Sequence, residues 1–288
     1  SVMRAGRLVG TQSTNETTPA DLAEQMVGRP VLLRLDKPES DPGRSVLEVN
    51  ALQVLGATGR PAVKGVSFAV RSGEIVAIAG VAGNGQSELL EGLAGVTSIL
   101  TGDYSVDGVT IDAVRRKDPA ELRAMGVAHV PEDRQRRGLV SAFTAAESAI
   151  LGYHNDSRWN GLLWMSGQAV REHCAQLMSD LDVRPGDPLA STGVLSGGNQ
   201  QKLLMAREMQ RNPKLLLVGQ PTRGVDIGAI ELIHQRLLTL RDAGVAILLV
   251  SVELEEVMSL ADRILVMLDG QIVGEVAGAD ATEKGLGL

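Results

Sequence analysis

A Ser-Gly-Gly turn that opens an apolar helix is the feature of this chain that most restricts its fold. The turn lies in Leu195-Ser196-Gly197-Gly198-Asn199-Gln200-Gln201, and apolar residues follow it at roughly helical spacing. Asn212-Pro213 ends the predicted helix, because proline lacks the amide hydrogen that a continuing helix needs, and residues 214–218 form the apolar run of a buried strand. The turn exposes backbone N–H groups at the positive end of a helix dipole, where anionic phosphate binds. This order of elements predicts a nucleotide-handling domain.

A second glycine-rich turn, at residues 80–87, follows the apolar segment 75–79. Its sequence is Gly80-Val81-Ala82-Gly83-Asn84-Gly85-Gln86-Ser87, and we expect a helix over residues 88–94. The spacing is that of a phosphate-binding loop, G-x-x-x-x-G-K-[ST], with Gln86 in place of lysine. The loop amides can still surround phosphate oxygens, and Ser87 can still reach Mg²⁺. Because a hydrogen bond to a charged group contributes ~1.5–3 kcal/mol, we expect weakened rather than abolished phosphate binding. Taken alone, the loop is also compatible with an ordinary glycine-rich strand–helix turn.

Apolar segments of strand length alternate with helical patterns through most of the chain. Strands are expected over residues 46–55, 62–70, 74–79 and 245–250, whereas residues 143–194 have no clear strand pattern. Alternation of buried apolar strands with helices predicts an α/β sheet. The segment without strands predicts a mostly helical insertion in that fold.

The composition excludes several classes of protein. A net charge of −7 and an aromatic content of 2% argue against a nucleic-acid-binding surface. The single cysteine, Cys174, cannot form an internal disulfide, and the four histidines lack ligand spacing from one another. No apolar run approaches the ~18 residues that span a bilayer. We therefore expect a soluble, cytoplasmic protein whose membrane contact, if it has any, comes through a partner.

The two ends of the chain resemble each other. Residues 2–10, VMRAGRLVG, and residues 266–274, VMLDGQIVG, are identical at five of nine positions. Asp269-Gly270 between two apolar runs predicts a hairpin. If the match is a repeat, residues 1–28 are the tail of a preceding homologous domain and residues 29–45 are a linker; otherwise the ends are two unrelated hairpins.

Four segments together resemble the nucleotide-binding domain of ABC transporters. In that family's terms, residues 80–87 look like the Walker A loop, residues 195–201 like the signature sequence, residues 215–220 like the Walker B strand and residues 224–226 like the D-loop. The resemblance covers roughly residues 46–278. It implies a P-loop NTPase core sheet of the ABC type with an N-terminal antiparallel β part and a helical subdomain at about residues 143–212, all within a domain spanning residues 46–288.

Two further sequence motifs indicate which branch of the family the chain resembles. Val130-Pro131-Glu132-Asp133-Arg134 and Pro221-Thr222-Arg223-Gly224-Val225-Asp226 resemble the second half of the double-domain ATPases of sugar and nucleoside importers. The sequences at residues 83–87 and 220–224 are most similar to the nucleoside branch. This resemblance accounts for the repeat at the two ends, since the chain would start inside the end of the first half.

Four positions depart from the active pattern of the family. Gln86 replaces the Walker A lysine, and Gly219 stands where the Mg²⁺-linked aspartate belongs. Gln220 replaces the glutamate that acts as general base, and an amide cannot take the proton. Val252 occupies the position of the switch histidine. Because phosphoryl transfer relies on positioned charge and an oriented water, the resemblance implies poor hydrolysis at this site.

The resemblance also assigns binding residues. ATP and Mg²⁺ are the implied cofactors, Ser87 is a weak Mg²⁺ ligand, and Glu132 aligns with the Q-loop glutamine. The implied nucleotide-binding set is Gly80, Val81, Ala82, Gly83, Asn84, Gly85, Gln86, Ser87, Glu88 and Glu132. The implied signature set, which would face ATP held by the first half of the polypeptide, is Leu195, Ser196, Gly197, Gly198, Asn199 and Gln200.

These assignments imply an energy-coupling subunit of an importer. Its partners would be the first nucleotide-binding half, two membrane permease subunits and, indirectly, an extracytoplasmic solute-binding protein. It would lie on the cytoplasmic face of the plasma membrane as a peripheral protein. The alternative is a catalytically inactive regulatory or interaction module that binds nucleotide weakly. A soluble ABC ATPase without a membrane partner fits less well, because such proteins usually keep their catalytic residues and carry long insertions.

Several other residues have two interpretations. Asp226 is either a helix N-cap or the D-loop contact across a dimer, or both. The basic run at residues 134–137 is either a solvated loop or a partner-facing surface. Trp159 and Trp164 are either core residues or part of an apolar patch that faces a membrane subunit. Met205, Met209 and the glutamates at 253, 255 and 256 are expected to be structural.

Overall fold

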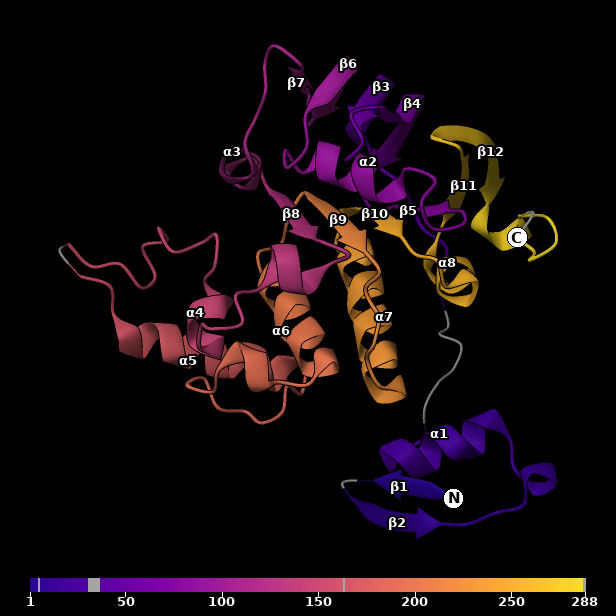
Figure 1. The fold of residues 1–288 in the computed structure, drawn as a ribbon, viewed down its shortest axis with the longest axis vertical. Helices are drawn as coiled ribbons and strands as arrows, with labels where there is room; N and C mark the ends of the chain where they lie inside the picture. Colours follow the sequence, from indigo (N-terminus) through magenta and orange to yellow (C-terminus); the bar gives the residue numbers. More distant parts are fainter. Residues whose placement is uncertain (5, 31–36, 163, 287–288) are drawn as a thin grey trace.

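The computed structural model describes residues 1–4, 6–30, 37–162 and 164–286. Part of the predicted linker, residues 31–36, and Leu163 of the Trp159–Met165 segment lie outside the described residues. A six-stranded sheet forms the centre of the molecule, in the order β12-β11-β5-β10-β9-β8 (Figure 1). Its strands are β5 (Ile75–Ala79), β8 (Val127–Val130), β9 (Leu215–Gly219), β10 (Ala246–Val250), β11 (Arg263–Leu268) and β12 (Gln271–Ala277).

The strands of this sheet are parallel except for β12, which runs antiparallel to β11 at one edge. Side chains of β5 alternate between two apolar clusters: Ile75 and Ala77 pack on one face, and Val76 and Ile78 pack on the other. A strand covered on both faces needs a continuous apolar run, which is what the sequence has at this position. The predicted α/β sheet is confirmed.

A second, antiparallel sheet lies above the central sheet in Figure 1. Its order is β4-β3-β6-β7, with β3 (Ser45–Leu55), β4 (Pro61–Arg71), β6 (Ile99–Val106) and β7 (Val109–Asp112). Helix α2 (Gln86–Leu93) packs between the two sheets, and its Leu89, Leu90 and Leu93 join their shared apolar cluster. The short helix α3 (Pro119–Ala124) precedes β8. The antiparallel part confirms the strands expected at residues 46–55 and 62–70.

Residues 143–194, the segment without predicted strands, lie to one side of the core, and we call them the helical part (Figure 1). Fewer than half of these residues are helical, so the prediction of a mostly helical insertion is only partly right. The helical part contains α4 (Ala145–Ala149), α5 (Gly167–Asp180) and the short turn η3 (Thr192–Val194), and it leads into α6 (Gly197–Met209). Met205 and Met209 of α6 are buried, as expected. Two further helices, α7 (Ile227–Asp242) and α8 (Leu254–Leu260), cover the face of the central sheet opposite the antiparallel strands.

The N-terminal residues form a small unit of their own, with β1 (Val2–Arg4), β2 (Arg7–Gly10), η1 (Thr14–Glu16) and α1 (Pro19–Val27). Its hairpin repeats the register of the β11–β12 hairpin position by position. Val2 pairs with Gly10, Met3 with Leu8 and Arg4 with Arg7. Correspondingly, Val266 pairs with Gly274, Met267 with Ile272 and Leu268 with Gln271, and both hairpins have their bulge after the first of these pairs.

The likeness of the two ends continues beyond the hairpins. A one-turn 3₁₀ helix follows each of them, η1 in the first case and η4 (Gly278–Asp280) in the second. Thr18 then caps α1 by accepting a hydrogen bond from Asp21 N, and Thr282 accepts the matching bond from Gly285 N. The interval along the chain is the same in every case. This agreement favours a repeat over two unrelated hairpins, while a preceding homologous domain stays a prediction.

The two hairpins differ in what lies beside them. In the second hairpin, β11 pairs with β5 as well as with β12. In the first, β1 pairs with β2 alone among the described residues. Met3 is therefore 63% exposed, whereas its counterpart Met267 is 1% exposed. Met3 thus occupies a position that is buried in the second hairpin, but among the described residues no core covers it in the first.

Candidate functional site

The loop between β5 and α2 has the backbone of a phosphate site. Gly80, Gly83 and Gly85 all have positive φ, so the chain curls before α2 begins. Gly85 cannot be replaced by a residue with a side chain for two reasons: its φ is 103°, and a Cβ atom would lie 2.4 Å from the carbonyl oxygen of Ala62. Because Gly85 is the N-cap, α2 starts two residues earlier than the sequence pattern predicts. Residues 81–83 at the tip of the loop are exposed.

Gln86 folds back into this loop instead of pointing out of it. Its Nε2 donates to the carbonyl oxygen of Val81 at 3.1 Å, and its Oε1 accepts from the backbone N of Asn84 at 3.1 Å. The side chain is buried, with 5% of its surface exposed. One of the amides that would otherwise bind a phosphate oxygen is therefore already bonded to the protein.

Ser87 and Glu132 meet at the base of the loop. The Ser87 hydroxyl donates to Glu132 Oε2 at 2.8 Å, and burial raises the pKa of the Glu132 carboxyl. Gly219 lies directly beside this carboxyl: a Cβ atom at position 219 would be 2.5 Å from Glu132 Cγ. An aspartate at position 219 would therefore force Glu132 to shift from its observed position. The carboxylate at this place is thus that of Glu132, in the turn that follows β8, and the end of β9 supplies none.

Gln220 and Val252 lie at the ends of neighbouring strands but supply no acid or base. Gln220 follows β9 with a positive φ of 50° and is buried. Its side-chain Oε1 lies 3.5 Å from the backbone N of Val252, and Val252 itself is half exposed with an aliphatic side chain. The two positions to which the sequence resemblance assigns the general base and the switch residue therefore contain an amide and an alkyl group.

The Ser-Gly-Gly turn lies at the surface, at the start of α6. Ser196 is the N-cap and accepts a hydrogen bond from the side-chain Nδ2 of Asn199 at 2.9 Å. Ser196 is exposed and Gly197 and Gly198 are half exposed, whereas Leu195 and Gln200 are buried and fix the turn to the core. The start of α6 is thus accessible from the surface, and phosphate binding there stays a prediction.

Arg134 connects the two glycine-rich regions; sequence reasoning placed it in the basic run at residues 134–137 but did not predict this connection. It lies in η2 (Arg134–Gly138), two residues after Glu132, and its Nη1 donates to the carbonyl oxygen of Arg223 at 3.0 Å. Its Nε donates to Gln200 Oε1 at 3.4 Å. A Cβ atom at Gly197 would lie 2.5 Å from Arg134 Nη2. The guanidinium therefore sits against the Ser-Gly-Gly turn, while Glu132 of the same segment reaches the phosphate loop.

Asn84 connects the phosphate loop to the β11–β12 turn. Its side-chain Oδ1 accepts from the backbone N of Asp269 at 2.9 Å, and its carbonyl oxygen accepts from Gly270 N at 2.9 Å. The sequence placed Asn84 in the loop but gave no sign of this long-range contact.

Asp226 has one of its two expected roles. It caps α7, accepting a hydrogen bond from Ala229 N at 3.0 Å, and it is exposed. The other role, a contact across a dimer, stays a prediction. Of the glutamates after β10, Glu256 is structural as expected: it is buried and accepts from the Thr222 hydroxyl at 2.8 Å. Glu253 and Glu255 are exposed, and their role stays a prediction.

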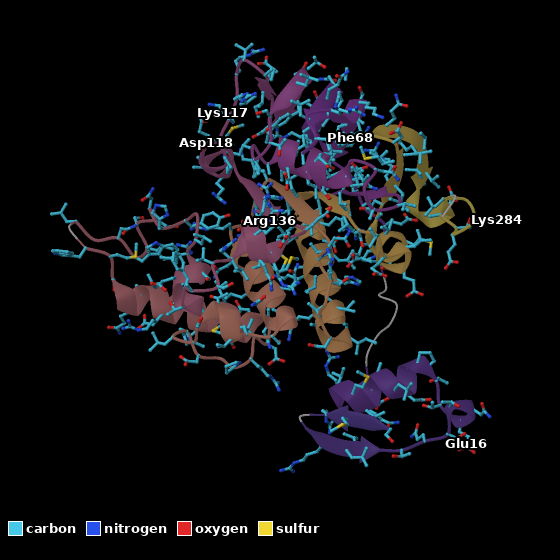
Figure 2. The ribbon with its side chains drawn as sticks, in the orientation of Figure 1. Glu16, Phe68, Lys117, Asp118, Arg136 and Lys284 are labelled. Carbon is cyan, nitrogen blue, oxygen red and sulfur yellow. The ribbon has the colours of Figure 1, made fainter. Side chains whose placement is uncertain are left out.

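A basic cleft lies between the core and the helical part, where Figure 2 labels Arg136. Its cavity has a volume of about 240 Å³. Burial lowers the pKa of His129 in its wall to about 4, so this imidazole is neutral at pH 7. The residues with cationic groups that line it are Arg123, Arg136, Arg137 and Arg207. The basic run at residues 134–137 is thus partly a cleft wall and not only a solvated loop.

The two tryptophans differ in their exposure to solvent. Trp159 is buried, and its Nε1 donates to the carbonyl oxygen of His154, whereas Trp164 is 83% exposed. Leu162 beside it is also fully exposed. Trp159 is therefore a core residue, and a contact of Trp164 with a membrane subunit stays a prediction.

The remaining candidate groups take no part in the site. Cys174 is buried in the helical part, and burial raises the pKa of its thiol to about 12. Within the described ranges, the His, Cys, Asp and Glu side chains form no group of three or more that could hold a metal ion. Nor does any helix in those ranges have the length and apolarity to cross a membrane.

Comparisons with known proteins agree on one family. Residues 63–223 match the model of the family described as ABC transporter. The chain is 41% identical over 288 residues to the nucleoside import ATP-binding protein NupA of Lactococcus lactis, and 39% identical over 288 residues to the guanosine import ATP-binding protein NupO of Bacillus subtilis. These matches cover 100% of the chain but 56% of each relative, so the chain spans about half the length of the curated relatives it matches.

A solved structure agrees in fold. A nucleotide-free ATP-binding cassette from an ABC transporter superposes with a TM-score of 0.67 at 25% sequence identity. The superposition covers 82% of this chain and 92% of that one.

Proposed function

Since the chain belongs to the ABC transporter family, we propose that it is the second half of the double-domain ATP-binding subunit of an importer for nucleosides or simple sugars. The observation that carries this proposal is the contrast between an exposed Ser196-Gly197-Gly198 turn and a phosphate loop whose own amide is bonded to Gln86. Two curated relatives of about twice this length are nucleoside and guanosine import proteins by name, which supports the substrate class.

In this proposal the chain contributes to ATP hydrolysis mainly in trans. The turn at residues 196–198 presents its amides to the phosphates of ATP held by the first half. Arg134, which lies against Gly197, adds a positive charge to the same corner. The chain's own loop, residues 80–87, holds a second nucleotide that is hydrolysed poorly, because Gln220 and Val252 offer no general base.

Mg²⁺ bound with that second nucleotide would be held by Ser87 and Glu132. A hydroxyl and a carboxylate, 2.8 Å apart, are oxygen ligands of the kind that Mg²⁺ prefers. The ion would neutralise phosphate charge. Glu132 supplies the single carboxylate, since Gly219 has no side chain and leaves the space that Glu132 fills.

The partners follow from the family and from two exposed features. The first half of the polypeptide would face the Ser-Gly-Gly turn, and two permease subunits would contact the helical part on the cytoplasmic face of the membrane. Trp164 and Leu162 form an exposed apolar tip there, and large exposed apolar side chains mark contact surfaces. A solute-binding protein would act through the permeases alone.

The experiment that tests this proposal compares two serines in the double-domain polypeptide. Ser196→Ala removes a group of the turn that faces the partner nucleotide, and Ser87→Ala alters the chain's own loop. We expect Ser196→Ala to lower ATP turnover about tenfold or more, and Ser87→Ala to lower it much less. Unchanged turnover in Ser196→Ala would instead favour the interaction module. Robust ATP turnover by residues 1–288 alone would contradict the proposal.

A further inference from the structure

Helix α1 packs on the first turn of α7 in a close, specific contact. The two methyl groups of Val27 lie 3.1 and 3.2 Å from where a Cβ atom of Gly228 would be, so Gly228 allows the two helices to approach. Ala23, one turn earlier on α1, is buried. We infer that this contact is an inter-domain latch, through which the end of a preceding homologous domain holds α7 beside Asp226.

A charged pair fixes the same contact beyond the end of α1. Arg29 Nη1 donates to Glu231 Oε2 at 2.7 Å, and Glu231 is buried on α7. The other oxygen of Glu231 accepts from Gln235 Nε2 at 3.3 Å. Removing Arg29 would leave a buried carboxylate without its cation, which is a costly arrangement. The latch is therefore defined by Val27 and Arg29 on one side and Gly228 and Glu231 on the other.

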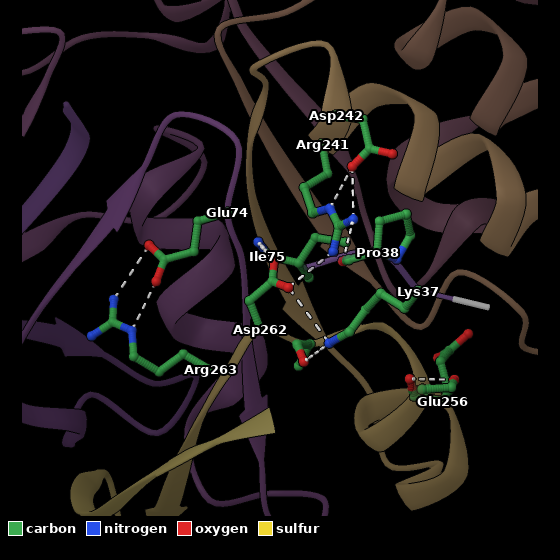
Figure 3. A network of polar contacts seen from close by, with 11 residues as sticks. Lys37, Pro38, Glu74, Ile75, Arg241, Asp242, Glu256, Asp262 and Arg263 are labelled. Atoms are coloured by element: carbon green, nitrogen blue, oxygen red, sulfur yellow. Dashed lines mark hydrogen bonds and ion pairs between the residues drawn. The ribbon is translucent and has the colours of Figure 1, made fainter. Parts of the chain in front are cut away.

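The chain is anchored a second time where it reaches the core (Figure 3). Lys37 Nζ donates to the carbonyl oxygen of Ala261 at 2.5 Å and lies 3.5 Å from Asp262 Oδ1. The guanidinium of Arg241, which is fully buried, donates to the carbonyl oxygen of Pro38 at 3.0 Å and to Asp262 at 2.9 Å. The segment between the two domains is thus bonded to this domain at both of its ends.

The partner is identified by the hairpin that precedes α1. Its register, bulge and 3₁₀ turn match those of residues 266–280, where β11 pairs in parallel with β5. Its Met3 is exposed where Met267 is buried. The occupant that fits the free edge of β1 is therefore a parallel strand equivalent to β5, from a core homologous to this one. This inference rests on the proposed function in one respect, that such a core precedes residue 1.

The position of the latch gives it a role in coupling the two domains. Asp226 Oδ1 lies 3.4 Å from where a Cβ atom of Gly228 would be, and Asp226 caps the turn that Val27 covers. A shift of the preceding domain thus reaches the Asp226 turn through one helix. Thr282 begins the same capped turn at the other end of the chain. This domain therefore has a segment equivalent to the start of α1, which could make the equivalent contact with the preceding domain.

Disulfide trapping tests the latch in the chain itself, without nucleotide. A cysteine Sγ at position 27 would replace a methyl group that lies about 3 Å from the Cβ site of residue 228, which is the reach of a disulfide. We expect Val27→Cys/Gly228→Cys to oxidise at least about tenfold faster than the control Met26→Cys/Gly228→Cys, because Met26 points to solvent. The buried Cys174 thiol does not compete, since its pKa is raised to about 12.

The charged pair supplies a second variant. Arg29→Glu in the Val27→Cys/Gly228→Cys background should slow disulfide formation, because it repels Glu231, whereas Arg29→Lys should not. Equal rates for the 27/228 and 26/228 pairs, or no intramolecular disulfide, would overturn the latch. These readouts need no ATP, so their failure is distinct from failure of the ATPase test.

Alkylation tests the identity of the partner. A cysteine in place of Met3 should react quickly with a maleimide in residues 1–288, and about tenfold or more slowly in the double-domain polypeptide, where the preceding core would bury it. Equal reactivity in the two proteins would show that β1 does not belong to a preceding sheet and would overturn that identification.

Discussion

Two glycine-rich turns open helices in this protein, residues 80–85 before α2 and residues 196–198 at the start of α6. In the first, Gln86 turns inward and bonds to Asn84 N and to the carbonyl oxygen of Val81. In the second, Ser196 stays at the surface and bonds within its own helix turn. Each turn thus bonds one amide to its own side chain, that of Asn84 to Gln86 and that of Asn199 to Ser196, but Gln86 is buried in its loop whereas Ser196 is exposed. We call the first turn closed and the second open in this sense. The comparison teaches that a phosphate-site backbone alone does not decide whether a ligand from outside can use it.

The largest effect is expected from adding a second carboxylate beside Glu132, at the base of the first turn. Gly219→Asp places a Cβ atom 2.5 Å from Glu132 Cγ and a second negative charge beside a buried carboxyl. Overpacking alone costs ~1–3 kcal/mol, and charge repulsion adds to it, so we expect the free energy of unfolding to fall by about 3 kcal/mol. Urea denaturation followed by circular dichroism measures it.

The control for this change removes the atom that clashes. Glu132→Ala in the Gly219→Asp background should recover much of the lost stability, so that the two changes are strongly non-additive. If Gly219→Asp alone were as stable as the starting protein, the view that Gly219 and Glu132 fit each other would be wrong.

The next effect is on nucleotide affinity at the closed turn. Gln86→Lys breaks the two bonds that fill the loop and supplies a cation for phosphate. A hydrogen bond to a charged group is worth ~1.5–3 kcal/mol, so ATP should bind about ten- to a hundredfold more tightly. Titration calorimetry measures it. Gln86→Met is the matched control, because it breaks the same bonds without adding charge; equal gains in both variants would mean that the loop bonds matter and the cation does not.

A smaller effect is expected at the open turn. Ser196→Ala removes the N-cap of α6 and should lower the free energy of unfolding by ~1 kcal/mol. ATP affinity of residues 1–288 should not change, because Ser196 is not part of the chain's own loop. Ser196→Thr keeps the cap and should be nearly neutral. Loss of ATP binding in Ser196→Ala would break the separation between the two regions.

The sequence predicted the parts of this molecule that depend on local order. Apolar runs predicted β5, β9 and β10, and the glycine spacings predicted both turns, because each signal lies within a few residues of the element it marks. The strand β8 was not predicted. The ends of α2 and β9 differ from the prediction by one or two residues. The start of α2 differs because Gly85 is its N-cap, and the end of β9 differs because Gly219 pairs with β10. A local sequence pattern shows neither of these contacts.

The contacts that give the site its character could not be predicted in the same way. Glu132 reaches Ser87, Arg134 reaches Arg223 and Asn84 reaches the turn at Asp269, each across a long interval of sequence. They depend on which strands are neighbours in the sheet, and no residue type in the sequence marks its partner. The fit between Gly219 and Glu132 is visible only when β8 and β9 lie side by side.

The smallest effect is expected at the residue that lies between the two regions. Arg134→Gln loses the bond to the carbonyl oxygen of Arg223 and the weak one to Gln200, and because Arg134 is half-buried the free energy of unfolding should fall by less than about 1 kcal/mol. Amide hydrogen exchange is the sharper measurement. The amides of Gly197, Gly198 and Asn199 should exchange faster in the variant, because the guanidinium that covers this turn is gone, while those of residues 83–85 should not change. Faster exchange in both turns would mean that the segment from Glu132 to Arg134 stabilises them as one unit. The two turns would then differ only in their side chains and would not be independent regions.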